Sequence, residues 1–442
     1  MMDLKSNLPS SEGYGRLEDL KGSKRALLIG TYQGGKEKPQ AEEQLSELAS
    51  LCETYGLETA LRLPCPIREF DAGTFLGKGK IEEIRELVLE HSAALVIFDD
   101  EITPQQQRNL EKMIECLVID RTELILGVFA QRAHTREAKI QIELATCRYQ
   151  LPRLKRLWTH LSRQRTGGSG KGGGGYLKGE GERQIEIDRR LLRTRIDRLQ
   201  ADLEEVKKNR ETQRRSRKRS GIPTFAIIGY TNAGKSTLLK ALTDADVLVE
   251  DKLFATLDTT TRKFSLPNRQ EILLTDTVGF IRKIPHLLVA AFKSTLEEAV
   301  QADILLHLID VSDPAAPLHA EATFEVLKEL GASKHPMITL LNKVDRCEER
   351  LLIEQMRILY PKTVEISALN RTGFERLMEL MVLEVSLLRK VVHLKIPQSH
   401  YSVVSVLMRE GKVLSCEYEE NDILLEVEIP RSLEHVVFPF QV

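Results

Sequence analysis

The sequence lacks the features of three classes of protein: membrane-spanning proteins, secreted proteins and proteins built around a structural zinc ion. No stretch approaches the ~18 consecutive apolar residues that a helix needs to cross a bilayer. The segment Met1 to Gly15 is polar and has no apolar core of the signal-peptide type, so secretion is not expected. The six cysteines form no CxxC pair, which favours reduced thiols over a zinc site. These absences predict a cytoplasmic protein, with association at a membrane surface left open.

The charge is unevenly distributed along the chain. The 442 residues, a length typical of about three domains, carry 64 Lys+Arg against 65 Asp+Glu. Residues 148–220 hold a net charge of +13, so the rest of the chain carries −14. Such a basic segment inside an acidic protein favours a polyanionic partner, most often nucleic acid. The alternative is a solvated, arginine-rich helix.

The first part of the chain alternates short apolar runs with helical patterns. The runs predict buried strands at 26–30, 59–63, 94–98 and 117–120, and helices are expected near 41–55, 80–91 and 104–115. Strands that alternate with helices of this length are typical of a parallel sheet with crossover helices. We therefore expect an α/β domain over residues 25–133, after a flexible N-terminus at 1–24.

The next segment, 134–220, has the pattern of a helical arm. Two apolar stripes of coiled-coil type are expected to pack as antiparallel helices, with a kink at Pro152 in the first. The stripes are Ile140, Leu144, Cys147, Leu151, Leu154, Trp158 and Leu161, and then Ile185, Leu192, Ile196, Leu199, Leu203 and Val206. Between them, nine of the 15 residues at 167–181 are glycine, which predicts a flexible tip. A simple disordered linker is the alternative.

Both ends of the predicted arm are basic. The residues that lead into or lie in the tip are Arg153, Lys155, Arg156, Arg163, Arg165, Lys171, Tyr176 and Lys178. The exit from the arm is the run KKNRETQRRSRKR at 207–219. Lysine, glycine and one tyrosine suit insertion into folded RNA, where a ring stacks on a base. For the exit run, a solvated linker is the alternative.

A phosphate-binding loop follows the arm. The strand FAII at 225–228 precedes GYTNAGKST, which matches GxxxxGK[ST] in its strand–loop–helix context. In such a loop backbone N–H groups surround the α- and β-phosphates, the lysine reaches the β- and γ-phosphates, and the hydroxyl after it binds Mg²⁺. The predicted nucleotide-binding residues are Gly229, Tyr230, Thr231, Asn232, Ala233, Gly234, Lys235, Ser236 and Thr237.

Two segments are expected to sense the third phosphate. The strand LLT at 273–275 ends in a DxxG motif formed by Asp276, Thr277, Val278 and Gly279. The sequence FATLD, formed by Phe254, Ala255, Thr256, Leu257 and Asp258, is expected to contact the nucleotide as an order–disorder switch. We assign Ser236, Thr256 and Asp276 to Mg²⁺, with Thr259 to Thr261 as alternatives to Thr256. Lys235, Thr256 and Gly279 are the predicted catalytic residues.

The base-reading motifs favour guanine. The strand at 337–341 ends in Asn342, Lys343, Val344 and Asp345, and the last strand is followed by Ser367, Ala368 and Leu369. The Asp345 carboxylate is expected to accept both guanine N1–H and the 2-amino group, and the Ala368 N–H to donate to guanine O6. Adenine cannot offer that pairing, and buried polar groups without partners penalise the wrong base. GTP and GDP are therefore the expected ligands.

Two positions bear on the rate of hydrolysis. Many GTPases place glutamine directly after DxxG to orient water, but this chain has Phe280, so slow turnover is expected from the protein alone. Asn232 is similar to an asparagine that resembles a K⁺ ligand in some related GTPases. K⁺ is accordingly a possible further cofactor, and the alternative is that Asn232 only braces the loop.

The remaining residues define the expected fold class. Residues 221–390 predict a G domain with a doubly wound, mostly parallel sheet. The tail, 391–442, has alternating runs at 402–408, 412–418 and 423–429, typical of strands, which predict a small strand-rich α+β domain. The whole chain is therefore expected to be α/β, with a two-helix arm and a small C-terminal domain.

Several of these segments together resemble the HflX family of GTPases. The resemblance rests on FLGKGK at 75–80, the glycine-rich arm GGSGKGGGGYLKGEGERQIEIDRR, GYTNAGKST, LFATLDTTTR and DTVGFI, and it extends over nearly the whole chain. It implies a GTPase that binds the large ribosomal subunit and separates stalled 70S ribosomes into subunits. It further implies that the arm and the N-terminal domain contact ribosomal RNA near the peptidyl-transferase and intersubunit regions.

Two other functions remain open at this point. One is a GTP-gated RNA-binding or ribosome-assembly factor, and the other is a regulatory binder whose G domain hydrolyses poorly because of Phe280. A monomer without a membrane span is expected in each case.

Overall fold

The structure is a computed structural model of the chain. It describes residues 24–154, 177–219, 222–243, 253–254, 259–283, 300–347, 349–419, 421–430 and 433–442. These residues fall into two compact units. The first contains the chain up to Leu203 together with Leu253 and Phe254, and the second contains the rest of the described residues. Each unit is considered by itself.

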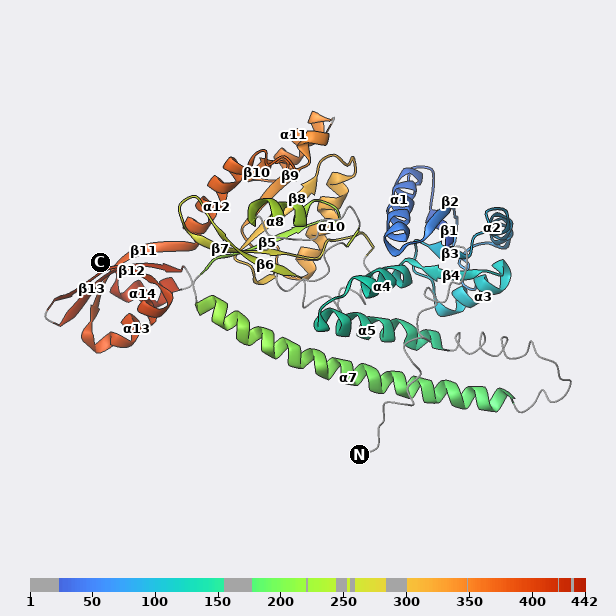
Figure 1. The fold of residues 1–442 in the computed structure, drawn as a ribbon, viewed down its shortest axis with the longest axis horizontal. Helices are drawn as coiled ribbons and strands as arrows, with labels where there is room; N and C mark the ends of the chain where they lie inside the picture. The colour runs from blue at the N-terminus through green and yellow to red at the C-terminus, as the bar shows by residue number, and fades with distance from the viewer. Residues whose placement is uncertain are drawn as a thin grey trace. The chain divides into compact units, whose positions relative to one another are not determined.

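The first unit begins with a four-stranded sheet in which every pair of neighbours is parallel (Figure 1). The strand order is β2-β1-β3-β4, so the first strand lies inside the sheet. The elements are β1 (Arg25–Tyr32), α1 (Lys38–Tyr55), β2 (Glu58–Pro66), α2 (Lys78–Glu90), β3 (Leu95–Phe98), α3 (Pro104–Ile114), β4 (Leu117–Asp120) and α4 (Arg121–Arg132). The predicted alternation of strands and helices is confirmed.

Helices cover both faces of this sheet. One core forms where Ile84 of α2 and Leu110 of α3 pack against Leu27, Val96 and other residues of the central strands. On the other side, α1 contacts α4, β1 and β2. The strands are therefore buried on both faces, which explains why they read as continuous apolar runs.

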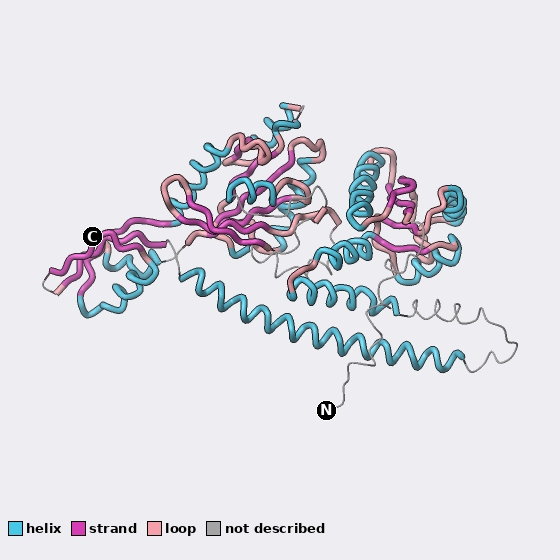
Figure 2. The backbone as a smooth tube through the Cα atoms, viewed as in Figure 1, coloured by secondary structure: helices cyan, strands magenta, loops and turns pink. Residues whose placement is uncertain are grey.

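The helical arm begins with α5 (Arg136–Gln150), continues in a 3₁₀ turn (Leu151–Arg153) and returns in α7 (Leu177–Arg219). Figure 2 shows α5 and α7 side by side, running in opposite directions. The apolar stripes meet as predicted in a cluster of Ile140, Leu144, Cys147, Leu151, Leu154, Leu192, Ile196, Leu199 and Leu203. The α-helix ends just before Pro152, which lies in the 3₁₀ turn.

One feature of the arm differs from expectation, and a second decides between two alternatives. Helix α7 begins at Leu177, so the last residues of the glycine-rich stretch 167–181 are helical rather than part of a loop. The same helix continues to Arg219, so the basic exit run belongs to a helix and not to a linker. Trp158, Leu161, Lys171 and Tyr176, and the basic residues Lys155, Arg156, Arg163 and Arg165, lie outside the described residues.

The second unit contains a six-stranded sheet of order β10-β9-β8-β5-β7-β6, parallel except for β6 at one edge. Its elements are β5 (Thr224–Gly229), α8 (Lys235–Thr243), β6 (Thr260–Ser265), β7 (Glu271–Asp276), β8 (Ile304–Asp310), α10 (Ala316–Glu329), β9 (Met337–Asn342), α11 (Arg350–Leu359), β10 (Thr363–Glu365) and α12 (Phe374–Leu388). The predicted mostly parallel, doubly wound sheet is confirmed.

Two cores hold this sheet. Phe225 and Ile227 of β5 pack with Leu238 of α8 and Met381 of α12 on one side. On the other, Ile309 and Leu341 pack with residues of α10 and α11 such as Ala320 and Met356. With both faces covered, the loops at the carboxyl ends of the strands remain as the place where a ligand binds.

The chain ends in a three-stranded antiparallel sheet of order β11-β13-β12. Its elements are β11 (Arg389–Pro397), α13 (Tyr401–Glu410), β12 (Lys412–Glu419), β13 (Asp422–Pro430) and α14 (Glu434–Val437). The strand predictions at 412–418 and 423–429 are confirmed. The strand predicted at 402–408 is wrong, because these residues form α13, whose Val404 and Leu407 are buried against the sheet.

Candidate functional site

The phosphate loop connects β5 to α8, as its sequence predicts. Gly229 ends β5 with a φ of 149° and Gly234 precedes α8 with a φ of 95°. A Cβ at Gly229 would collide with the Leu308 carbonyl, and one at Gly234 with the side-chain nitrogen of Asn342. Both positions therefore require glycine, for the backbone angle and for the space. Between them Thr231 and Ala233 are buried, whereas Asn232 is exposed with a φ of 60°.

Lys235 begins α8 and its ammonium lies inside the loop. Its Nζ donates to the carbonyl oxygens of Tyr230 at 2.7 Å and Gly229 at 3.2 Å. Burial lowers the pKa of this ammonium to about 8, although the negative charge of Asp276 acts in the opposite direction. A cation held in so little water is well suited to bind an anion such as a phosphate.

Asp276, the acidic residue of DxxG, ends β7 next to β5 and is fully buried. The Ser236 hydroxyl donates to Asp276 Oδ2 at 2.7 Å. The next residue, Thr277, donates its hydroxyl to the Ile227 carbonyl at 2.7 Å and so fixes the motif against β5. The two oxygen-bearing side chains predicted to bind Mg²⁺ thus meet at the carboxyl ends of two neighbouring strands.

The residues after Asp276 lie against the phosphate loop. The Phe280 N–H donates to the Gly229 carbonyl at 3.1 Å, and the Thr231 N–H donates to the Phe280 carbonyl at 2.7 Å. The Phe280 ring is 1% exposed. The Thr231 hydroxyl is buried without a hydrogen-bond partner in the described part of the chain. Val278 is buried as well, and Gly279 lies beside Thr231 and Lys235.

The base-reading motifs also come together. Asn342 at the end of β9 donates its Nδ2 to the Ala233 carbonyl at 2.8 Å, and its Oδ1 accepts from the Ala368 N–H at 2.9 Å. One side chain therefore fastens the phosphate loop to residues 367–369. The Ala368 N–H expected to reach guanine O6 is bonded to Asn342 in this structure.

The other residues of these motifs surround this connection. Lys343 pairs with Asp310 at 2.6 Å, and Asp345 lies exposed in the short 3₁₀ turn Val344–Arg346. The Ser367 hydroxyl accepts from the Asn370 N–H, and the side chain of Leu369 is exposed. The accessible carboxylate of Asp345 leaves an acceptor at the place where the sequence predicts recognition of the base.

The switch segment is described only in part. Ala255, Thr256, Leu257 and Asp258 lie outside the described residues, so the structure does not bear on Thr256 as a metal ligand. Phe254 belongs to the first unit, has a φ of 55° and is buried. Its ring contacts the Phe129 ring of α4 edge-on, with centroids 4.6 Å apart. The sequence pattern gave no sign of this contact.

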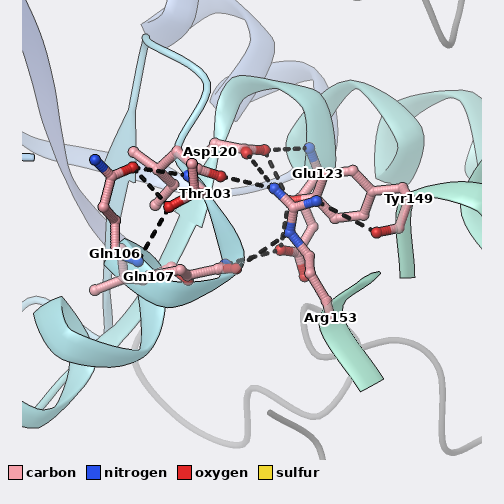
Figure 3. A network of polar contacts seen from close by, with 9 residues as sticks. Thr103, Gln106, Gln107, Asp120, Glu123, Tyr149 and Arg153 are labelled. Carbon is pink, nitrogen blue, oxygen red and sulfur yellow. Dashed lines mark hydrogen bonds and ion pairs between the residues drawn. The ribbon is translucent and has the colours of Figure 1, made fainter. Parts of the chain in front are cut away.

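Arg153 does not belong to the basic surface that the sequence suggested. Figure 3 shows its guanidinium in a buried network that joins the 3₁₀ turn after α5 to the end of β4 and the start of α3. It pairs with Asp120 at 3.2 Å, donates to the Ile102 carbonyl at 2.8 Å and lies 3.7 Å above the Tyr149 ring. The Tyr149 hydroxyl donates to Asp120 at 2.9 Å. Arg153 therefore anchors the base of the arm to the N-terminal sheet.

The described residues contain neither a membrane-spanning helix nor a group of side chains arranged to bind a metal ion. No helix in the described ranges has the length and apolar character that would let it cross a bilayer. Within the same ranges no three His, Cys, Asp or Glu residues are grouped to bind a metal ion.

Three family models match consecutive parts of the chain. A model described as GTP-binding GTPase N-terminal matches residues 42–130, and one described as GTP-binding GTPase Middle Region matches residues 132–217. A model described as 50S ribosome-binding GTPase matches residues 224–343, which include the phosphate loop, DxxG and the beginning of the base-reading motif.

Relatives that align over most of the chain include proteins named GTPase HflX. A GTPase HflX of Chlamydia pneumoniae is 48% identical over 417 residues, which cover 94% of this chain and 88% of the relative. A GTPase HflX of Escherichia coli (strain K12) is 45% identical over 345 residues, which cover 78% and 79%. Among solved structures, a GTP-binding protein from Sulfolobus solfataricus in complex with GDP is 26% identical with a TM-score of 0.42, covering 82% of this chain and 99% of that one. Since the identity extends over nearly the whole sequence, the chain belongs to the HflX family of GTPases.

Proposed function

We propose that this GTPase binds the large ribosomal subunit when GTP is bound and separates stalled 70S ribosomes into their subunits. The observation that carries the proposal is the continuity between the arm and the nucleotide site. The basic helix α7 ends at Arg219, and only the strand β5 lies between it and the phosphate loop at Gly229. The loop follows the carboxyl end of β5 and α7 precedes its amino end, so a single strand couples the nucleotide site to an arm suited to RNA.

Within the site, we propose that the phosphate loop and DxxG bind the phosphates of GTP with Mg²⁺. The Ser236 hydroxyl and the Asp276 carboxylate are 2.7 Å apart and offer the hard oxygen ligands that Mg²⁺ prefers. Phosphate oxygens would complete the coordination, so the site needs no larger cluster of acidic residues. Mg²⁺ supplies neutralisation of the charge that develops on the phosphates. Lys235 holds its proton near those oxygens, and the buried Thr231 hydroxyl remains as a further donor.

Thr256 and Gly279 keep the roles that the sequence suggests, as a Mg²⁺ ligand and as a backbone donor to the γ-phosphate. For the base, we propose that Asp345 accepts from guanine N1–H and the 2-amino group. Ala368 would then exchange its bond with Asn342 for one with guanine O6, which needs only a small shift because Asn342 remains bonded to Ala233.

The buried ring of Phe280 supports slow hydrolysis by the protein alone. A phenyl ring that is 1% exposed neither orients water nor lies open to do so. We propose that docking on the ribosome supplies the missing organisation, an effect that in other GTPases amounts to about 10³–10⁵ in rate. Asn232, exposed on the loop, is the proposed ligand for an activating K⁺.

The division into an N-terminal domain, a helical arm, a G domain and a small C-terminal domain, with the boundaries given by the sequence, stays a prediction. So do a monomeric state and the contact of the arm with ribosomal RNA. Because the family model that matches the G domain is described as ribosome-binding, we propose that the protein acts in the cytoplasm.

The test is conversion of 70S ribosomes into subunits, followed on a sucrose gradient with a nonhydrolysable GTP analogue, with GDP and without nucleotide. We expect splitting with the analogue and little with GDP. A variant lacking residues 167–176, which precede α7, should bind GTP as the wild type does but lose most splitting. Ribosomes that stay intact with wild-type protein and the analogue would contradict the proposal, and undiminished splitting by the deletion variant would reduce the tip to a linker.

A second candidate is a GTP-gated binder that acts without turnover, and the observation that favours it is again the buried Phe280. Measuring whether ribosomal subunits stimulate hydrolysis distinguishes it from the first.

A further inference from the structure

Gly279, the last residue of DxxG, lies beside the lysine of the phosphate loop. A Cβ built on Gly279 would lie 2.8 Å from Thr231 Cγ2 and 2.9 Å from Lys235 Nζ. Gly279 therefore lies close to the ammonium, with no room for a side chain between them. A γ-phosphate bound by both Lys235 and the Gly279 N–H must stand between these two donors, with about 2.8 Å to each nitrogen. Making that room requires a shift of the Lys235 side chain, of the segment 279–282 or of both when GTP binds, whereas GDP has no γ-phosphate and makes no such demand.

Three hydrogen bonds connect this segment to the phosphate loop, and together we call them the latch. Two are the backbone bonds of Phe280 with Gly229 and Thr231. The third involves a side chain, because the Tyr230 hydroxyl accepts from the Arg282 N–H at 2.8 Å. Tyr230 thus extends from the phosphate loop toward the residues after DxxG.

The Tyr230 ring is itself fixed. It is 7% exposed and stacks on the His319 ring of α10, with centroids 3.9 Å apart and planes 12° from parallel. A ring held on a helix of the fold presents its hydroxyl at one position, so little freedom is lost when it accepts the bond from Arg282. The stack makes Tyr230 a rigid part of the latch.

We propose that Tyr230 is a positioning residue that sets how strongly this GTPase prefers GDP to GTP. On this proposal the γ-phosphate makes its room by displacing the segment 279–282, so the free energy of opening the latch is subtracted from the affinity for GTP alone. Removing one of the three contacts makes opening easier, and the affinity for GTP then rises while that for GDP stays. The inference rests on the GTPase function of the family and concerns a residue whose side chain need not touch the nucleotide.

The test uses the full chain, Mg²⁺, and two probes, GDP and the nonhydrolysable analogue guanosine 5′-(β,γ-imido)triphosphate, titrated by calorimetry. Tyr230→Phe removes the acceptor and keeps the ring on His319. Loss of one hydrogen bond predicts an affinity for the analogue about three- to tenfold higher relative to GDP. Tyr360→Phe, a tyrosine that stacks on Phe324 in the same unit, is the matched control and should leave the ratio unchanged.

A second variant protects the test against a folding defect. His319→Ala removes the stack without altering the phosphate loop, and it should shift the ratio in the same direction. Thermal unfolding without nucleotide shows whether each variant is folded. An unchanged ratio in both variants, or equal losses of affinity for both nucleotides, would overturn the proposal, because a purely structural tyrosine affects the two alike. Binding of GDP by the wild type tests the GTPase function separately.

Discussion

The Ser236 hydroxyl donates a hydrogen bond of 2.7 Å to the carboxylate of Asp276, forty residues further along the chain. The contact joins the phosphate loop to DxxG, because β5 and β7 are neighbouring parallel strands whose carboxyl ends lie at the same edge of the sheet. Both side chains present an oxygen atom to the position proposed for Mg²⁺. This relationship makes the nucleotide site a single structure and underlies the predictions that follow.

Ser236→Ala should lower GTP turnover about 100-fold or more, since it removes one ligand of the proposed Mg²⁺ and the charge stabilisation that depends on it. Thr243→Ala is the matched control, because that hydroxyl lies on the same helix and, among the described residues, bonds only to the Leu239 carbonyl. Turnover is measured by phosphate release at saturating GTP. Normal turnover by the Ser236 variant would refute the assignment of the metal site.

Asp345→Asn should change the base preference from guanine toward xanthine. The variant loses two charge-assisted hydrogen bonds to guanine, which predicts a roughly 100-fold weaker affinity for GDP, while the new amide donates to the xanthine oxygen. The measurement is competition between guanosine and xanthosine diphosphates. Glu349→Gln, which neutralises a nearby exposed carboxylate, should retain the selectivity of the wild type, and an unaltered preference in the Asp345 variant would exclude its role in reading the base.

Nucleotide binding should take up a proton at mildly alkaline pH. Burial lowers the pKa of free Lys235 to about 8, and phosphates next to the ammonium raise it again in the complex. Above pH 8 the free lysine is therefore neutral and the bound one is charged, so affinity falls as pH rises. Calorimetry in two buffers with different heats of ionisation should find about one proton taken up at pH 9 and almost none at pH 6.5. The absence of uptake at pH 9 would contradict the protonation state assigned to this lysine.

Arg153→Met should destabilise the first unit by about 3–5 kcal/mol, because Asp120 would remain buried without its charged partner. Burial already raises the pKa of this carboxyl, and Arg153 is the main group that opposes the rise. Trp158, the only tryptophan of the chain, allows urea unfolding to be followed by fluorescence. Arg136→Met, at an exposed position on the preceding helix α5, serves as the control. Adding Asp120→Asn to the first variant should recover part of the loss, and no such recovery would argue against the ion pair.

Replacing K⁺ by Na⁺ should slow GTP turnover if Asn232 binds an activating K⁺ on the phosphate loop. The comparison is made at constant ionic strength with wild type and Asn232→Ala, and the variant should respond equally to the two ions. Identical rates of the wild type in K⁺ and Na⁺ would leave Asn232 as a residue that only braces the loop.

Much of the fold follows from local patterns. The strands around Val96 and Ile227 are short apolar runs between helical periodicities, and the coiled-coil stripe through Leu144 and Leu199 has its own spacing. The phosphate loop is likewise predictable, because two of its glycines are needed for backbone angles that the motif encodes. The strand prediction for 402–408 is wrong because its valines suit a strand and a helix face equally well. Packing against the sheet decides between the two.

Long-range contacts of single side chains could not be predicted. Nothing in the composition around Tyr230 indicates that His319 stacks on it, nor that Phe254 packs on Phe129. Arg153 lies among basic residues and reads as one of them, although the fold places it beside a buried aspartate. Such partners are set by tertiary structure, and the sequence holds no periodic signal for them.

The most direct test of the account is GTP turnover in K⁺ buffer with and without purified large ribosomal subunits. Because the ring of Phe280 is buried and takes no part in orienting water, the account predicts slow turnover alone and stimulation of at least about tenfold by the subunits. A rate that is equally slow in both conditions would contradict the proposal that the ribosome completes the catalytic site of this GTPase.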